Sequence, residues 1–168
     1  MPLEKKPPTL PAPGRRGRIV AVSVSDRKGE VKHNVDQAQL LVERGLAGDA
    51  HAEGGIRQVS LLAMASIDKM VAAGAKVAPG DFAENLTVEG LAVMSLPLGT
   101  RLQVGEAVEL EITQIGKTCH KGCAIRELVG DCVMPREGVF ARVLKEGLVK
   151  PGDVIEVTDV PGGHSDRQ

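Results

Sequence analysis

Three cysteines and a histidine lie close together in the second half of the chain. Cys119, Cys123 and Cys132 fall within 14 residues, and Lys117 and His120 lie beside the first of them. The thiolate is the form of cysteine that attacks electrophiles and binds metals, and neighbouring cations lower the pKa of a thiol. The pattern therefore favours a reactive or metal-ligating Cys119 over a cysteine that only fills space.

Two other interpretations of this cluster stay open. Free cysteine is often buried as a small apolar side chain, which would make Cys119 structural. Cys119, His120, Cys123 and Cys132 also supply four nitrogen or sulfur ligands for a structural zinc ion. Against zinc, adjacent side chains on a strand point to opposite faces, and no second Cys-x2-Cys or His-x3-His pair follows.

A second group of polar residues surrounds the Gly-Gly pair at 54–55, in the first half of the chain. Residues 48–51 (Gly-Asp-Ala-His) are followed by residues 57–60 (Arg-Gln-Val-Ser). Arg57 has the planar fork that binds a phosphate or a carboxylate with two hydrogen bonds. His51 could act as an acid, a base or a ligand. The alternative is a polar turn whose side chains are simply solvated.

Two further segments carry candidate binding residues. Residues 80–87 (Gly-Asp-Phe-Ala-Glu-Asn-Leu-Thr) include Asn85, whose amide presents a donor and an acceptor together and so suits the edge of a heterocycle. Arg142 interrupts the apolar run 139–144. Such an arginine usually lies on the solvated face of a strand, and if it faces inward it needs an anionic partner.

The composition excludes several classes of function. The chain has no Trp, no Tyr and only two Phe, so it lacks the aromatic platforms on which single-stranded nucleic acid stacks. The formal net charge is −1, which gives no basic surface for nucleic acid or an anionic membrane. No apolar run is long enough to span a membrane, and the N-terminus lacks an apolar signal-peptide region. We expect a cytoplasmic protein with reduced thiols.

Short strands with period-two alternation must position these residues. We expect strands at 20–24, 38–42, 59–61, 108–112, 139–144 and 154–157, a helix at 63–73 that ends before Gly74, and a shorter helix at 123–129. Many strands and few helices predict a mainly β fold, a bent barrel or sandwich, and argue against a parallel βαβ sheet. One domain at 16–160 is expected between tails at 1–15 and 161–168.

Taken in order, these segments resemble the MOSC domain, the family named for the C-terminal domain of molybdenum cofactor sulfurases. The resemblance runs over about 18–158 and is carried by residues 45–51, 57–62, 80–87 and 98–100, Cys119 after a strand, Arg142 in a strand, and Gly152-Asp153. It implies a MOSC-like bent β-barrel with a few short helices. It also implies that the chain binds molybdenum cofactor (molybdopterin).

By position, the resemblance assigns roles to individual residues. Cys119 is the cysteine that carries sulfur as a persulfide or ligates molybdenum. Arg57, Asn85, Thr87 and Arg142 are the candidates for the pterin and its phosphate, and His51 would line the pocket. Cys123 or Cys132 would serve as the resolving thiol, with Lys117 and His120 favouring the thiolate.

The resemblance also bounds partners and function. No pyridoxal-phosphate site is identified in this chain, so sulfur would come from a separate cysteine desulfurase, and molybdenum cofactor biosynthesis proteins or molybdoenzymes would receive it. A sulfurtransferase-like activity is the leading hypothesis. The alternatives are a non-enzymatic cofactor carrier or insertion chaperone, a molybdenum-dependent reductase of N-hydroxylated compounds, and zinc-stabilised structure alone.

Overall fold

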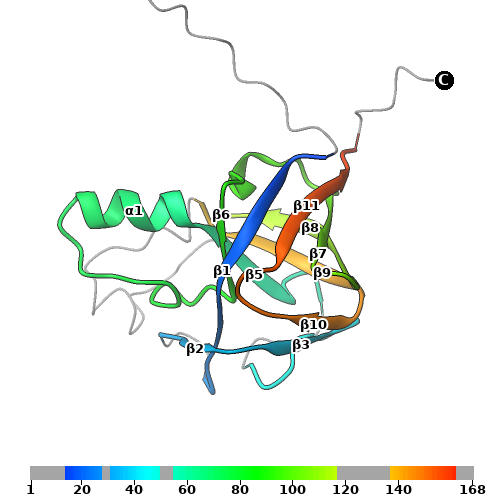
Figure 1. Cartoon of the computed structure of the whole chain (residues 1–168), viewed down its shortest axis with the longest axis horizontal. Helices are drawn as coiled ribbons and strands as arrows, with labels where there is room; N and C mark the ends of the chain where they lie inside the picture. Colours follow the sequence, from blue (N-terminus) through cyan, green and yellow to red (C-terminus); the bar gives the residue numbers. More distant parts are fainter. Residues whose placement is uncertain (1–13, 28–30, 50–54, 117–136, 162–168) are drawn as a thin grey trace, which may run out of the picture.

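Short strands rich in valine and leucine make up most of the structure, a computed structural model that describes residues 14–27, 31–49, 55–116 and 137–161 (Figure 1). The strands are β1 (Arg16–Val24), β2 (His33–Val35), β3 (Ala38–Leu41), β4 (Gly45–Leu46), β5 (Val59–Ala63), β6 (Leu86–Glu89), β7 (Arg101–Val104), β8 (Val108–Ile115), β9 (Val139–Lys145), β10 (Gly147–Val149) and β11 (Val154–Asp159). One helix, α1 (Met64–Ala72), and one 3-10 turn, η1 (Val93–Ser95), complete the described elements. The expected mainly β fold is confirmed.

Seven of the strands close into a barrel. Their order around the barrel is β11-β7-β8-β9-β5-β6-β1, and β11 pairs with β1 to complete the circle. Strand β2 extends the sheet from β1, and a second sheet of order β10-β3-β4 lies across one end of the barrel (Figure 1). This small sheet adds Leu40, Leu46 and Val149 to the barrel core.

One pair of neighbouring strands in the barrel is parallel. The small number of helices expected from the sequence had argued against a parallel sheet. Strands β5 and β6 run parallel, with Leu61 opposite Leu86, and α1 lies in the connection between them. A parallel pair needs a crossover of this kind, and the single described helix supplies it. The other pairings in the described residues are antiparallel.

Helix α1 forms where the apolar spacing predicts it and ends at the expected glycine. Gly74 has φ +106°, a left-handed conformation that glycine adopts without steric cost. The N–H of Ala75 donates to the carbonyl of Met70, and the N–H of Gly74 donates to the carbonyl of Val71. These two bonds form a Schellman cap, which satisfies carbonyls left free at the helix end. No helix in the described part of the chain is long and apolar enough to cross a membrane.

Two apolar clusters lie on opposite faces of the barrel wall. The first fills the barrel and takes Val139, Ala141 and Val143 from β9. The second lies between the wall and α1, and it contains Leu62, Ile67, Met70, Phe82, Ala83 and Phe140. Both phenylalanines of the chain therefore pack beneath α1, at 1% and 6% exposure.

Some sequence expectations fall on other parts of the chain. The helix expected at 123–129 lies outside the described residues, as do most of both expected tails.

Candidate functional site

The predicted thiol cluster lies outside the described residues, but the points where that segment leaves and rejoins the barrel are described. This applies to Lys117, Cys119, His120, Cys123 and Cys132, and equally to His51. The N–H of Gly116 donates to the carbonyl of Gly138 at 2.6 Å, so the ends of β8 and β9 lie side by side. Glu137 accepts a hydrogen bond from Ser66 and forms an ion pair with Lys69 on α1. The described residues on either side of the cysteine-bearing segment are therefore close together, and one of them, Glu137, contacts α1.

Asn85 is completely buried and bridges two strands. Its Oδ1 accepts hydrogen bonds from the Ser60 backbone N–H at 2.9 Å and from Ser60 Oγ at 3.2 Å. Its Nδ2 donates to the carbonyl of Ser23 at 3.1 Å. The amide donor and acceptor of Asn85, which the sequence suggested for a heterocycle, thus bond to β1 and β5. These bonds hold the residue just before β6 in place. The ligand role predicted for Asn85 stays a prediction.

Thr87 belongs to a second buried polar group, centred on Glu84. Thr87 Oγ1 donates to Glu84 Oε2 at 2.8 Å, and the backbone N–H of Gly80 donates to the same oxygen at 2.8 Å. The N–H of Phe82 donates to Glu84 Oε1 at 3.2 Å. Burial raises the pKa of the Glu84 carboxyl above its usual 4.5, and the hydrogen bonds from Gly80 and Thr87 lower it in part.

The Glu84 carboxylate organises a loop with unusual backbone geometry. Gly80 and Ala83 have φ values of +97° and +67°. A Cβ on Gly80 would lie 2.6 Å from the carbonyl oxygen of Lys32, so only glycine fits there. Ala83 is a non-glycine residue in the left-handed region, where a Cβ is disfavoured. Backbone strain of this kind persists only where the surroundings over-determine it.

Arg57 lies over the aromatic ring of Phe140. Its guanidinium carbon is 5.8 Å from the ring centroid, within range for a cation–π interaction. Phe140 pairs in register with Ser60 on β5, and Ser60 bonds to Asn85. The structure therefore connects Arg57 to Asn85 through one continuous line of contacts, while the guanidinium itself stays exposed.

Arg142 lies on the outer face of β9, two residues beyond Phe140. Its neighbours Ala141 and Val143 face the barrel core, so alternation turns Arg142 outward. Its Nη2 donates to Glu43 Oε2 at 2.8 Å, with side-chain exposures of 42% for Arg142 and 56% for Glu43. Its Nε is buried and has no hydrogen-bond partner among the described residues. Arg142 thus lies on the solvated face and keeps one donor free.

A buried ion pair was not anticipated from the sequence. Lys32 Nζ lies 2.7 Å from Asp49 Oδ1, and both side chains have 0% exposure. Ser25 completes the group, because its N–H donates to Asp49 and its Oγ accepts from Lys32. Asp49 belongs to a segment that the sequence singles out, but Lys32 lies in a short run with no distinguishing pattern. Only the fold brings the two charges together.

A family model for the MOSC domain matches residues 48–156 of the chain. The chain belongs to the MOSC domain family. The matched range contains every predicted site residue. His51 lies near its start, and the others lie further inside: Arg57, Asn85, Thr87, Arg142 and the cysteine cluster with Cys119. No curated protein matches the chain significantly.

Solved bacterial structures share the MOSC barrel. The YUAD protein from Bacillus subtilis is 19% identical with a TM-score of 0.71, over 84% of this chain and 95% of that one. YiiM from Geobacillus stearothermophilus is 21% identical with a TM-score of 0.68, over 88% and 77%. YiiM from Escherichia coli is 21% identical with a TM-score of 0.59, over 89% and 71%. At these identities the likeness shows the fold alone.

The described part of this MOSC domain can be tested against the cofactor that the family name implies. Two outward guanidiniums, Arg57 and Arg142, suit a phosphate, and the buried Nε of Arg142 is a donor that lacks an acceptor. Within residues 14–27, 31–49, 55–116 and 137–161, no group of three or more His, Cys, Asp or Glu side chains could hold a metal ion. The described residues therefore fit the phosphate of the cofactor, and the predicted molybdenum ligand, Cys119, lies outside them.

Proposed function

We propose that this MOSC protein binds molybdenum cofactor and carries sulfur as a persulfide on Cys119. The observation that carries the proposal is the family match over 48–156, which contains Cys119, Arg142 on the outer face of β9, and Arg57, which lies over Phe140. The adjoining ends of β8 and β9 support it, because the described residues that flank the cysteine-bearing segment, Gly116 and Glu137, are close together and Glu137 contacts α1.

Residues of the outer face would hold the cofactor. Arg57 and Arg142 would bind its phosphate, and His51 would line the pocket. Asn85 and Thr87 would support the site indirectly. Their hydrogen bonds to Ser60 and Glu84 hold β5 and β6 in position. When bound, the cofactor would supply a molybdenum centre that accepts sulfur.

The sulfur chemistry uses thiols of this chain, a persulfide donor and a dithiol reductant. The Cys119 thiolate attacks the terminal sulfur of a persulfide on a cysteine desulfurase, a new S–S bond forms, and the desulfurase thiolate leaves. Lys117 and His120 favour the attacking thiolate. Cys123 or Cys132 then attacks Cys119 Sγ, which releases sulfide and leaves a disulfide that a dithiol reductant resets. The protein that would receive the sulfurated cofactor is a molybdenum cofactor biosynthesis protein or a molybdoenzyme in the cytoplasm.

Intact-mass analysis tests the persulfide directly. We expect the chain, after incubation with a cysteine desulfurase and cysteine, to gain the mass of one sulfur atom. Cys119→Ala should not gain it, whereas Cys132→Ala, the matched control, should gain it and hold it at least as long. If Cys119→Ala gains sulfur as the unaltered chain does, the proposed role of Cys119 is wrong.

A non-enzymatic cofactor carrier is the second candidate, and one observation favours it. The described residues offer two exposed arginines and the unpartnered Nε of Arg142 as binding groups. These groups could hold a cofactor without any reaction at a thiol. A carrier would retain cofactor in Cys119→Ala and lose it in Arg142→Gln. Retention of cofactor without any uptake of sulfur by the unaltered chain would favour the carrier over the sulfurtransferase.

A further inference from the structure

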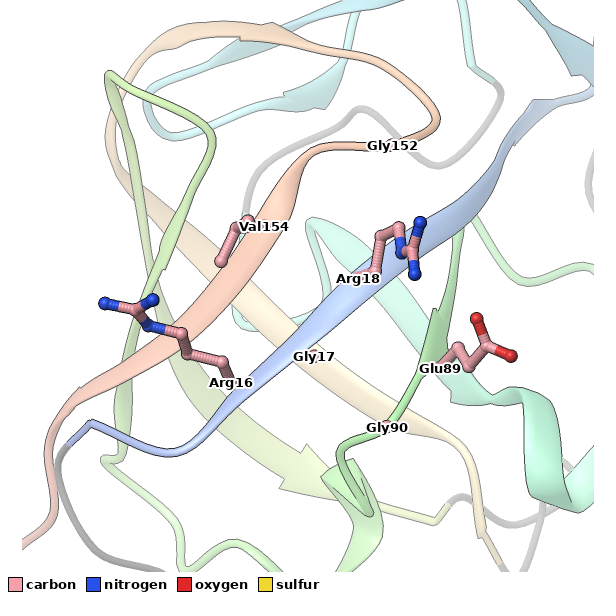
Figure 2. A pocket seen from close by; sticks show the side chains of 7 residues that line it. All are labelled: Arg16, Gly17, Arg18, Glu89, Gly90, Gly152 and Val154. Carbon is pink, nitrogen blue, oxygen red and sulfur yellow. The ribbon is translucent and has the colours of Figure 1, made fainter.

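An open hollow of about 550 Å³ lies where β11, β1 and β6 run side by side. Figure 2 shows its lining, which consists of two arginines and Gly17 from β1, Glu89 at the end of β6 with Gly90 after it, and Val154 at the start of β11 with Gly152 in the turn before it. None of the predicted site residues of the MOSC domain lines it. The hollow is therefore a surface feature separate from the face that carries Arg57 and Arg142.

Three glycines shape the hollow. A Cβ on Gly17 would lie 2.5 Å from the carbonyl oxygen of Glu89 and 2.9 Å from Leu91 Cβ, so close packing of β1 against β6 requires glycine there. Gly90 and Gly152 have φ values of +85° and +96°, which other residues rarely adopt. Strand glycines often mark a close approach of another backbone, and here that approach sets the positions of β1 and β6 beneath the two arginines.

The charge of the lining is positive although the chain as a whole carries −1. Arg16 and Arg18 are two residues apart on β1, so their side chains leave the same face of the strand. Arg16 lies 3.5 Å from Glu156, with 68% of its side chain exposed. Arg18 has Glu89 opposite it in register, yet it makes no ion pair within the described residues. Neither guanidinium is tightly neutralised by the protein.

We propose that this hollow binds a small polyanion of the organic diphosphate class, with one arginine on each phosphate. Figure 2 shows the two guanidiniums diverging from β1 on either side of Gly17, which suits two anionic groups better than one. A guanidinium binds phosphate oxygens through two parallel hydrogen bonds. The volume lies within the range of small-molecule sites and exceeds what a single phosphate needs.

Calorimetric titration of the full chain with inorganic pyrophosphate tests the site. Calorimetry is chosen because the chain has no Trp or Tyr to report binding by fluorescence. We expect saturable binding that is about tenfold or more weaker for inorganic phosphate, for citrate, and for Arg18→Gln. Val154→Asp, which places a carboxylate opposite Arg18, should weaken binding similarly. Arg101→Gln, which removes an exposed arginine of β7 outside the hollow, should change the affinity less than about twofold.

Several outcomes would overturn the proposal. The absence of saturable binding by the unaltered chain would do so, as would equal losses in Arg18→Gln and Arg101→Gln, which would indicate general charge attraction. An equal loss in Arg57→Gln would place the pyrophosphate on the face of the proposed cofactor site instead. Citrate binding as tight as that of pyrophosphate would contradict the diphosphate class. Sulfur uptake by Cys119 is independent of these results, so either proposal can fail alone.

Discussion

Two ion pairs of nearly equal length lie in opposite environments. Lys32 and Asp49 are 2.7 Å apart with no exposed side-chain surface, whereas Arg142 and Glu43 are 2.8 Å apart and about half exposed. From the distances alone, the two pairs would be expected to contribute equally to stability. Burial decides their roles, because a charge buried without its partner is strongly penalised, whereas water can replace an exposed partner. The first pair holds the fold, and the second can be opened by a ligand.

The largest effect is expected from Lys32→Met. This change removes the Lys32 ammonium from beside the buried Asp49 carboxylate, which costs about 3–5 kcal/mol of stability. Urea denaturation followed by far-UV circular dichroism measures the loss. The double variant Lys32→Met with Asp49→Leu is the control, and we expect it to recover part of the stability. A single variant as stable as the unaltered chain would contradict the contrast between the two pairs.

Glu84→Gln tests the buried carboxyl that lacks a cation among its described contacts. The new amide N–H would face another hydrogen-bond donor, from Gly80, Thr87 or Phe82. We therefore expect the free energy of unfolding to fall by about 2 kcal/mol. Because burial raises the pKa of Glu84 above 4.5, the folded protein binds this proton more tightly than the unfolded chain.

The sign of the pH dependence follows from that tighter binding. The contribution of Glu84 to stability falls as pH rises from 4.5 through the raised pKa, so the gap between the unaltered chain and Glu84→Gln should narrow over that window. Denaturation midpoints of both proteins across the window measure it. A gap that is constant with pH, or that widens, would contradict the raised pKa.

Phe82→Leu should have a smaller effect. The ring is 1% exposed in the cluster beneath α1, and its replacement leaves a small cavity, which costs about 1–2 kcal/mol. Cofactor binding should persist in the folded variant, because the ring supports the segment from below. A folded Phe82→Leu protein that binds no cofactor would make the ring a direct contact.

The smallest effect on stability is expected from Glu43→Gln. Exposed ion pairs contribute about 0–1 kcal/mol, so the denaturation midpoint should hardly change. The same change frees Arg142 Nη2, and cofactor affinity should stay equal or rise. Arg142→Gln is the matched control and should lose affinity. A large loss of stability in Glu43→Gln would remove the distinction between the two ion pairs.

The local parts of the fold could be predicted from the sequence. Alternation marked residues 108–112 and 154–157, which lie in β8 and β11, and the glycine at position 74 marked the end of α1. These features depend on residues within one or two turns or pleats of each other. The order of the motifs was enough to indicate the MOSC family, which the family match confirms.

Partners distant in the sequence could not be predicted in the same way. Asn85 meets Ser60 and Ser23 only because β1, β5 and β6 meet at that point, so a side chain suited to a heterocycle serves the backbone as well. Lys32 finds Asp49 only across the folded chain. A buried charge carries no local pattern, since its partner and its burial are both set by tertiary structure.

The closure of the barrel has one more consequence, for how the domain can be joined to other proteins. Strand β1 pairs with β11, and the N–H of Gly14 donates to the carbonyl of Val157, so the first and last described segments lie side by side (Figure 1). Adjacent chain ends are the geometry that tolerates insertion and circular permutation. The barrel can therefore be spliced into a surface loop of a host protein, or reopened at another turn, while its pairings stay intact.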